Sequence, residues 1–287
     1  MNTKYSFLRI ISFAVLLFTA CAIPGLTYEP TLPPVVPSTT LSPQASPPVT
    51  NTDPIRPAEK IMIENPAPNI EVSSPVAVNG FSQPAFEQSL VVQITDESGS
   101  IIAEEYPNIR AEIGQAGIYI IEVAFNIPYS QPGRLSVFDI SPRDGGILHL
   151  TSVPVILVPS LKTDPMPTKP QPEVILIEAP QFLAEVTGGE VQISGYSDYF
   201  FESNLGLAIC GEGGSGEGHM LCGTQDNLLV EGFALIKSPD IGLPGPFYGT
   251  LDYTVTVSTR ARVVVYAQSP RDGDLLHVST QEITLLP

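Results

Sequence analysis

The 287-residue sequence is poor in several residue types that carry much of protein chemistry. It has three cysteines, three histidines, and 13 lysines and arginines against 30 aspartates and glutamates, for a formal net charge of −17. A surface this acidic repels nucleic acid, so we expect no nucleic-acid partner. The sequence also lacks a nucleophile elbow, a phosphate-binding loop and a His-Glu metalloprotease motif. It therefore predicts no catalytic residues and no cofactor.

Segments with the apolar spacing of a helix are missing beyond the first 20 residues. Short runs rich in Val, Ile, Phe and Tyr are instead separated by Gly, Pro, Asn or Asp. Such runs lie at 90–94, 101–103, 118–125, 135–140 and 147–158, and again at 191–193, 205–209, 253–257 and 263–266. Several short strands separated by frequent turns predict an all-β fold of the β-sandwich type.

One segment occurs twice. Ser-Pro-Arg-Asp-Gly at 141–145 recurs at 269–273, and each copy is followed at the same spacing by a histidine, His149 or His277. Because Asp-Gly favours tight turns, we expect a hairpin turn at each copy, formed by Asp144 with Gly145 and by Asp272 with Gly273. Equivalent residues of duplicated domains are more often structural than catalytic, so both histidines are expected to be structural.

Further similar residues upstream extend this sequence repeat. They predict two tandem domains, residues 61–158 and 172–287. The linker between them, 159–171, is rich in Pro and predicted to be semi-rigid. We therefore expect the two sandwiches to lie end to end as separate domains.

The N-terminus has the form of a targeting signal. Lys4 and Arg9 precede an apolar run at 10–18 that is too short to span a bilayer comfortably, so residues 1–20 are predicted to be a signal peptide. Residues 18–21, Phe-Thr-Ala-Cys, resemble the lipobox of bacterial lipoproteins, which implies that Cys21 is lipidated. An ordinary secretory signal is the alternative. Residues 21–60, crowded with Pro, Thr and Ser, are predicted to be a disordered tether. The predicted location is extracytoplasmic and membrane-anchored, at a bacterial cell surface or in the periplasm.

The second domain carries about 13 extra residues, which include Cys210 and Cys222. In an exported chain this pair is expected to form a disulfide, with free thiols as the alternative. A metal site of Cys210, His219 and Cys222 would lack a fourth ligand. A calcium site at Asp144 and Asp272 would lack a dense Asp-x-Asp run. No metal is therefore predicted.

Repeated charges suggest two ion pairs within the sandwiches. Glu87 would pair with Arg134 in the first domain, and Glu202 would pair with Arg262 in the second. Solvated charges are an equally open interpretation, because charged side chains usually stay exposed.

The segments at 73–80, 86–87, 94–96 and 141–145 together resemble the bacterial spore-germination immunoglobulin-like domain family. The resemblance covers nearly all of the first domain. The second copy keeps Gly195, the Phe-Glu pair at 201–202 and the Asp-Gly turn, but it lacks the Ser-Pro start. The resemblance implies an immunoglobulin-like sandwich on an exported protein. It implies neither a catalytic activity nor that the organism sporulates.

These features predict a non-enzymatic, lipid-anchored envelope protein that acts in adhesion, envelope assembly or ligand binding. Its partner would be an envelope protein or a polysaccharide. The segment from Cys210 to Cys222 is the preferred contact surface, since a disulfide would pre-organise it. The alternatives are an envelope carbohydrate-active enzyme or hydrolase, and a passive surface spacer.

Overall fold

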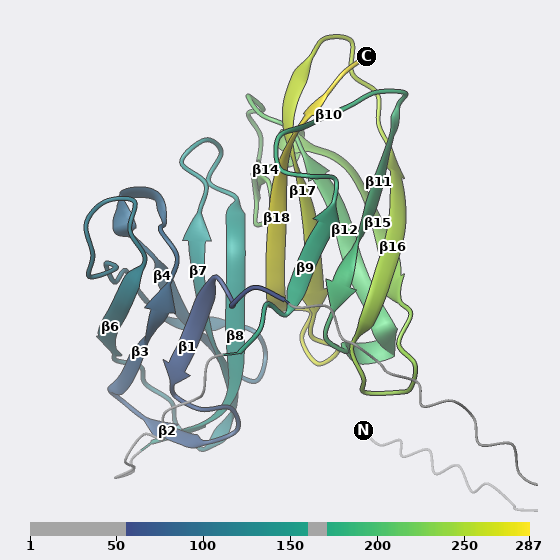
Figure 1. Ribbon diagram of the computed structural model, residues 1–287. Helices are drawn as coiled ribbons and strands as arrows, with labels where there is room; N and C mark the ends of the chain where they lie inside the picture. Colours follow the sequence, from purple (N-terminus) through teal and green to yellow (C-terminus); the bar gives the residue numbers. More distant parts are fainter. Residues whose placement is uncertain (1–55, 160–170) are drawn as a thin grey trace, which may run out of the picture. The chain divides into compact units, whose positions relative to one another are not determined.

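The computed structural model describes residues 56–159 and 171–287 (Figure 1). The predicted signal peptide, Cys21, and most of the predicted tether and linker lie outside the described residues. Apart from three short 3-10 turns, the regular structure of the described part is β-strand, which confirms the predicted all-β class. Among these residues, no helix has the length and apolar character needed to cross a membrane.

The first β unit, blue to teal in Figure 1, is a two-layer sandwich. One layer has the order β1-β3-β6 and the other has the order β5-β4-β7-β8. The bounds are β1 (Ile61–Asn65), β2 (Glu71–Ser73), β3 (Val76–Ser82), η1 (Phe86–Gln88), β4 (Val91–Thr95), β5 (Ile101–Glu105), β6 (Gly117–Val123), β7 (Gln131–Ile140) and β8 (Ile147–Val158).

The second β unit repeats this order. Its elements are β9 (Ile175–Ala179), β10 (Ala184–Val186), β11 (Glu190–Ser197), η2 (Phe201–Ser203), β12 (Asn204–Cys210), β13 (Gly218–His219), β14 (Gly223–Thr224), η3 (Gln225–Asn227), β15 (Leu228–Ile236), β16 (Gly245–Asp252), β17 (Thr259–Gln268) and β18 (Leu275–Leu285). Strands β9, β11 and β16 pair as β1, β3 and β6 do, and β12, β15, β17 and β18 pair as β4, β5, β7 and β8 do. The elements β13, β14 and η3 have no counterpart in the first unit.

Each unit has its own apolar core between its two layers. Alternate residues of the strands point inward, as the period of a β-strand requires. The first core includes Val78, Ile94 and Leu135, and the second includes Ile193, Leu207 and Val263, all essentially inaccessible to solvent.

Strand β8 pairs with β18, so one continuous sheet runs through both units (Figure 1). The prediction of two sandwiches lying end to end is therefore wrong. The physical reason is that β8 and β18 each leave part of one strand edge free, and they cover each other there, at Leu150–Thr151 and His277–Val278. Other parts of these edges pair with β2 and β10.

Two further expectations need correction. Residues 56–60, assigned to a disordered tether, are ordered here: Ala58 forms a β-bridge with Pro172, and Glu59 is buried. Residues 253–257, expected as a strand, instead form an irregular connection between β16 and β17. The pairing of β16 with β11 ends at Asp252, and β-branched residues alone do not supply a new pairing partner.

Gly195 in β11 offers a test of the packing between strands. A Cβ at this position would lie 1.9 Å from the carbonyl oxygen of Leu176 and 2.8 Å from the ring of Phe247. Gly195→Ala is therefore expected to lower the free energy of unfolding by about 2 kcal/mol, because neither the backbone nor the buried ring can move freely. Urea unfolding measures the change.

Gly218→Ala is the matched control for this substitution. A Cβ at Gly218 meets no atom within 4 Å, so its stability should match wild type. Equal stabilities of the two variants would contradict the packing argument.

Candidate functional site

The junction between the two β units is nearly two-fold symmetric. In the pairing of β8 with β18, His277 lies opposite Thr151 and Val278 lies opposite Leu150. Because residues 149–151 correspond to 277–279 in the sequence repeat, each strand presents the same segment to the other. Equivalent residues of the two copies therefore meet at the junction.

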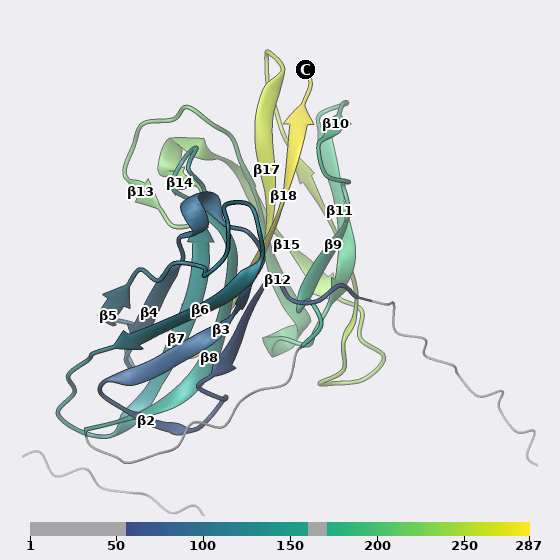
Figure 2. The same cartoon turned by 60° about the vertical axis from the view of Figure 1, so that its left-hand side comes forward.

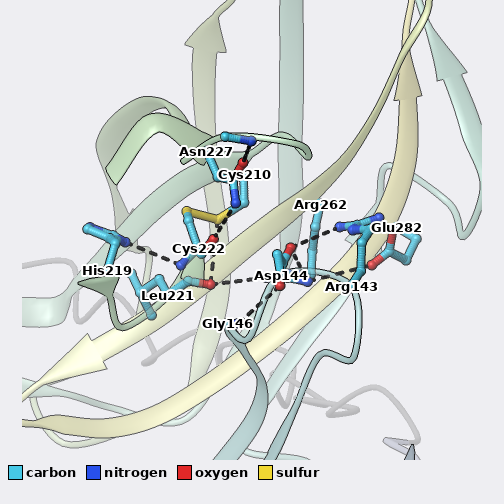
Figure 3. The surroundings of a disulfide bond; sticks show 11 residues. Arg143, Asp144, Gly146, Cys210, His219, Leu221, Cys222, Asn227, Arg262 and Glu282 are labelled. Atoms are coloured by element: carbon cyan, nitrogen blue, oxygen red, sulfur yellow. Dashed lines mark hydrogen bonds and ion pairs between the residues drawn. A yellow bond between two sulfur atoms is a disulfide. The ribbon is translucent and has the colours of Figure 1, made fainter. Parts of the chain in front are cut away.

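Arg262 of β17 is buried against the turn of the first unit (Figure 3). Its Nη1 lies 3.3 Å from Oδ2 of Asp144, and its Nη2 donates to Oδ1 of Asp144 at 3.3 Å. Neither side chain exposes more than 1% of its surface. Burial alone would raise the pKa of Asp144, but the Gly146 amide and the Arg262 guanidinium outweigh it and hold this pKa below its usual value. The carboxylate is therefore charged when the two units are docked.

Arg134 of β7 makes the reciprocal contact with the turn of the second unit. Its Nη2 lies 3.8 Å from Oδ1 of Asp272, and both side chains are almost fully buried. Burial lowers the pKa of Arg134, and the charge of Asp272 partly offsets this effect. The two arginines thus exchange partners across the junction.

The predicted ion pairs Glu87–Arg134 and Glu202–Arg262 are wrong. Glu87 and Glu202 are exposed, and each has a positive φ, 54° and 55°, within a short 3-10 turn. This left-handed conformation directs the two acids to solvent, while the arginines point to the opposite unit. The Phe-Glu repeat thus belongs to a strained local turn.

The two Ser-Pro-Arg-Asp-Gly segments form the same turn. The Gly145 amide donates to the carbonyl of Ser141, and the Gly273 amide donates to the carbonyl of Ser269, at 2.8 and 2.9 Å. Both glycines have φ near +78°, which residues with a Cβ rarely adopt (77° and 79°). These turns hold Asp144 and Asp272 where the arginines of the other unit reach them.

The insertion at 211–227 closes one side of the junction. A disulfide joins Cys210 and Cys222, and both residues are fully buried. The carbonyl of Leu221 accepts from Nη2 of Arg262 at 3.1 Å, and the carbonyl of Met220 accepts from the amide of Ile147 at 3.2 Å. Figure 2 shows this excursion, with β13 and β14, reaching toward the first unit.

Small residues make this docking possible. A Cβ at Gly223 would lie 1.6 Å from the carbonyl oxygen of Asp144, and one at Gly146 would lie 2.3 Å from that of Leu221. A third apolar cluster fills the space behind them, with Phe138 and Leu150 from the first unit and Cys222 and Val264 from the second. The C-terminal end of the disulfide-bearing segment is thus occupied by contacts within the chain, whereas most residues from 212 to 220 are exposed.

A cluster of buried ionisable groups lies elsewhere at the junction. It consists of Glu59, His149, Glu173 and His277, each between 2% and 3% exposed. Burial alone would raise the pKa of Glu173, but the two histidines and Lys60 outweigh this and lower it. These groups are the described residues best suited to hold a metal ion.

The sequence reasoning placed both histidines in structural roles and missed both glutamates. A signal for them existed, since Glu59 lies two residues before Ile61 of β1, and Glu173 lies two residues before Ile175 of β9. The composition around Glu59 is that of a tether, which obscures this signal.

Comparison with protein families gives one match, and it falls in the first unit. Residues 60–146 match the family model of the immunoglobulin-like domain of bacterial spore germination. Over these residues the first unit is similar to the immunoglobulin-like domains of this family. The match confirms the resemblance predicted from the sequence, and it lies within the sandwich formed by β1 to β8.

Comparisons with whole proteins are weaker. No curated protein matches the chain. Similar solved structures include the BSP domain of a biofilm-associated protein, with 10% identity, a TM-score of 0.23, and coverage of 79% of this chain and 29% of that one. Dimeric latent PorU from Porphyromonas gingivalis shows 12% identity, a TM-score of 0.25, and coverage of 80% and 20%. Red sea bream transglutaminase shows 9% identity, a TM-score of 0.26, and coverage of 80% and 32%. This chain thus spans less than a third of each of these proteins, and likenesses this weak carry no functional argument.

Proposed function

We propose that this protein is an exported, lipid-anchored and non-enzymatic module of a bacterial cell envelope. Its two β units would act together as one rigid head that binds an envelope protein or a polysaccharide. The observation that carries this proposal is the continuous sheet through β8 and β18, reinforced by the exchanged Arg–Asp pairs. Units joined in this way present a single surface of fixed geometry, which suits binding or scaffolding.

The remaining support comes from the family match and from the sequence. An immunoglobulin-like domain is a common scaffold for recognition, although a fold alone does not establish a function. The lipobox-like segment that ends at Cys21 supports anchoring, because a bacterial lipoprotein carries enough acyl chains for stable membrane attachment. The second unit, with the same strand order as the first, is proposed to be a second immunoglobulin-like domain.

Anchoring is tested by Cys21→Ala in the full chain. We expect wild type to incorporate labelled palmitate and to sediment with membranes, and the variant to do neither. The control is Cys210→Ala/Cys222→Ala, which removes the other two thiols and should leave the labelling unchanged. Equal labelling of wild type and Cys21→Ala would reject the lipid anchor.

Binding is tested with the full chain carrying Cys21→Ala and with purified peptidoglycan and envelope polysaccharides. Cosedimentation without release of soluble sugar is the expected result. Release of sugar would instead support the carbohydrate-active enzyme. If neither binding nor turnover is detected, the polysaccharide partner is rejected.

A further inference from the structure

Four buried side chains converge at the junction from separate parts of the chain. Glu59 and Glu173 lie just before β1 and β9, and His149 and His277 lie in the paired strands β8 and β18. One ligand atom from each of the four lies within 4.8 Å of the others. Each unit supplies one glutamate and one histidine, so the set is complete only when the two units are docked.

The arrangement follows from the near two-fold symmetry of the junction. The two imidazole rings meet edge to face, with centroids 5.0 Å apart and planes at 88°. The segments that carry the glutamates also pair reciprocally, because the Glu59 amide donates to the carbonyl of Gln171 and the Glu173 amide donates to that of Pro57. Two copies of one Glu-His arrangement are thus brought face to face.

Two ring nitrogens of this cluster are not satisfied by hydrogen bonds. Nε2 of His277 is buried without a hydrogen-bond partner, 3.7 Å from Oε1 of Glu59 and 3.9 Å from Oε1 of Glu173. Nδ1 of His149 is likewise buried without a hydrogen-bond partner, 3.7 Å from Oε1 of Glu173. These separations are too long for hydrogen bonds. A tetrahedral ion with bonds of about 2.0–2.1 Å holds its ligand atoms about 3.4 Å apart. The ligand atoms here lie within 4.8 Å of one another, so side-chain adjustments of about 1 Å would bring them to that spacing.

Charge and chemistry select the ion. Two carboxylates removed from water need compensating positive charge, which a divalent cation supplies. Imidazole nitrogens favour Zn²⁺ and neighbouring transition metals, whereas Ca²⁺ and Mg²⁺ require six or more ligands, mainly oxygens. Nε2 of His149 is in direct contact with Oε1 of Glu59, so an ion bound by both atoms would replace the proton of this hydrogen bond.

Neighbouring groups already orient the carboxylates. Oγ of Ser279 donates to Oε1 of Glu173 at 3.0 Å, and the amide of Val174 donates to Oε2 of Glu59 at 2.9 Å. Such supporting hydrogen bonds are typical of metal ligands. A cavity of about 350 Å³, lined by Glu59 and His277, provides a route for an ion to enter.

The geometry points to a divalent transition-metal site formed by Glu59, His149, Glu173 and His277. The bound ion links the two β units. Four protein ligands leave no open position for a substrate, so the role of the ion is structural. The ion stabilises the docked arrangement because it binds only when both units contribute their ligands.

The first test uses Zn²⁺ and the full chain carrying Cys21→Ala, stripped of metal by a chelator. Calorimetric titration should show one Zn²⁺ per chain, and saturation should raise the unfolding temperature. X-ray absorption of the zinc-loaded protein should detect two imidazole ligands. Since the chain has only three histidines, and His219 belongs to the disulfide loop, two imidazoles identify this cluster. Absence of stoichiometric binding, or zinc without imidazole ligands, would overturn the proposal.

Variants provide a second test. His277→Gln and Glu173→Gln should each weaken Zn²⁺ binding by about 100-fold or more, since loss of a direct ligand exceeds the usual 10–100-fold effect of losing a supporting group. The matched control His219→Gln should bind zinc as wild type does. If His277→Gln, folded by circular dichroism, bound zinc with unchanged affinity, the assignment to this cluster would be wrong. The X-ray absorption result decides the matter without any variant, should both variants fail to fold.

Discussion

Asp144→Ala is expected to lower the free energy of unfolding by about 3–5 kcal/mol, the usual effect of removing one partner of a buried ion pair. Arg262 is fully buried, and without Asp144 its charge loses its closest carboxylate. The remaining carboxylate near Arg262 is that of Glu282, whose Oε1 lies 3.9 Å from Nη1 of Arg262. This contact is long and Glu282 is partly exposed, so Glu282 compensates poorly for the loss. Urea unfolding followed by circular dichroism measures the change.

Asp272→Ala is the matched control, because it occupies the equivalent turn. Both aspartates accept a backbone amide two residues on, at 3.0 Å for Asp144 and 3.2 Å for Asp272, so loss of this bond is common to both variants. The Arg134–Asp272 contact is longer, at 3.8 Å, and we expect a smaller loss of about 1–2 kcal/mol. If the two variants lost equal amounts of unfolding free energy, the closer Arg262–Asp144 pair would not be the more stabilising one.

Removing both partners sharpens the test. Asp144→Ala/Arg262→Met should be more stable than Asp144→Ala alone, because no buried charge is left unpaired. A double variant that is less stable than the single variant would show that Arg262 acts mainly through other contacts, such as its bond to the Leu221 carbonyl.

The same pair predicts a pH dependence. The pKa of Asp144 is lower in the folded protein than its usual value, so the ionised form is stabilised by folding. This contribution is fully present above about pH 5 and decreases as the pH falls through about 4 and below. The stability difference between wild type and Asp144→Ala should therefore be constant from pH 7 to pH 5 and smaller at pH 3. If the stability difference between wild type and Asp144→Ala were as large at pH 3 as at pH 7, the predicted pH dependence would be wrong.

Cys210→Ala/Cys222→Ala is expected to lower the free energy of unfolding by about 3 kcal/mol, the chain-entropy value for a loop of this size. The bridge holds residues 211–221 in a closed loop whose end docks on the first unit. Without it, the unfolded chain gains conformational freedom and the loop loses its fixed position. Urea unfolding measures the loss.

Two comparisons make the disulfide prediction specific. Cys21→Ala removes the remaining cysteine and should leave stability unchanged. The double cysteine variant and Asp144→Ala should not be additive, since the Leu221 carbonyl and the Asp144 carboxylate bind the same arginine. Simple additivity would show that the loop and the ion pair stabilise the junction independently.

Local features of the chain were predictable from the sequence. The strand that became β8 was expected at 147–158 and is found at Ile147–Val158. The Asp-Gly turns were expected from residue type alone, because only a few neighbouring residues determine a tight turn. The run at 253–257 shows the limit of such reasoning, since its composition favours a strand but no partner strand lies beside it.

Partnerships across the chain were not predictable. Arg134 and Arg262 were recognised as equivalent, yet each pairs with an aspartate of the other unit. Sequence spacing cannot show this, because it depends on which edge strands meet. For the same reason the two glutamates of the candidate metal site were missed, although the histidines were noticed.

The amino-acid sequence by itself determined the all-β class and the repeated turns, since these depend on side-chain alternation and local backbone preferences. Only the tertiary structure decided that β8 meets β18. That pairing joins the two predicted sandwiches through a single sheet. It also brings Glu59, His149, Glu173 and His277 together in one buried cluster. The physical reason is that an edge strand gains most by covering its free backbone groups, and its partner can come from any distance along the chain.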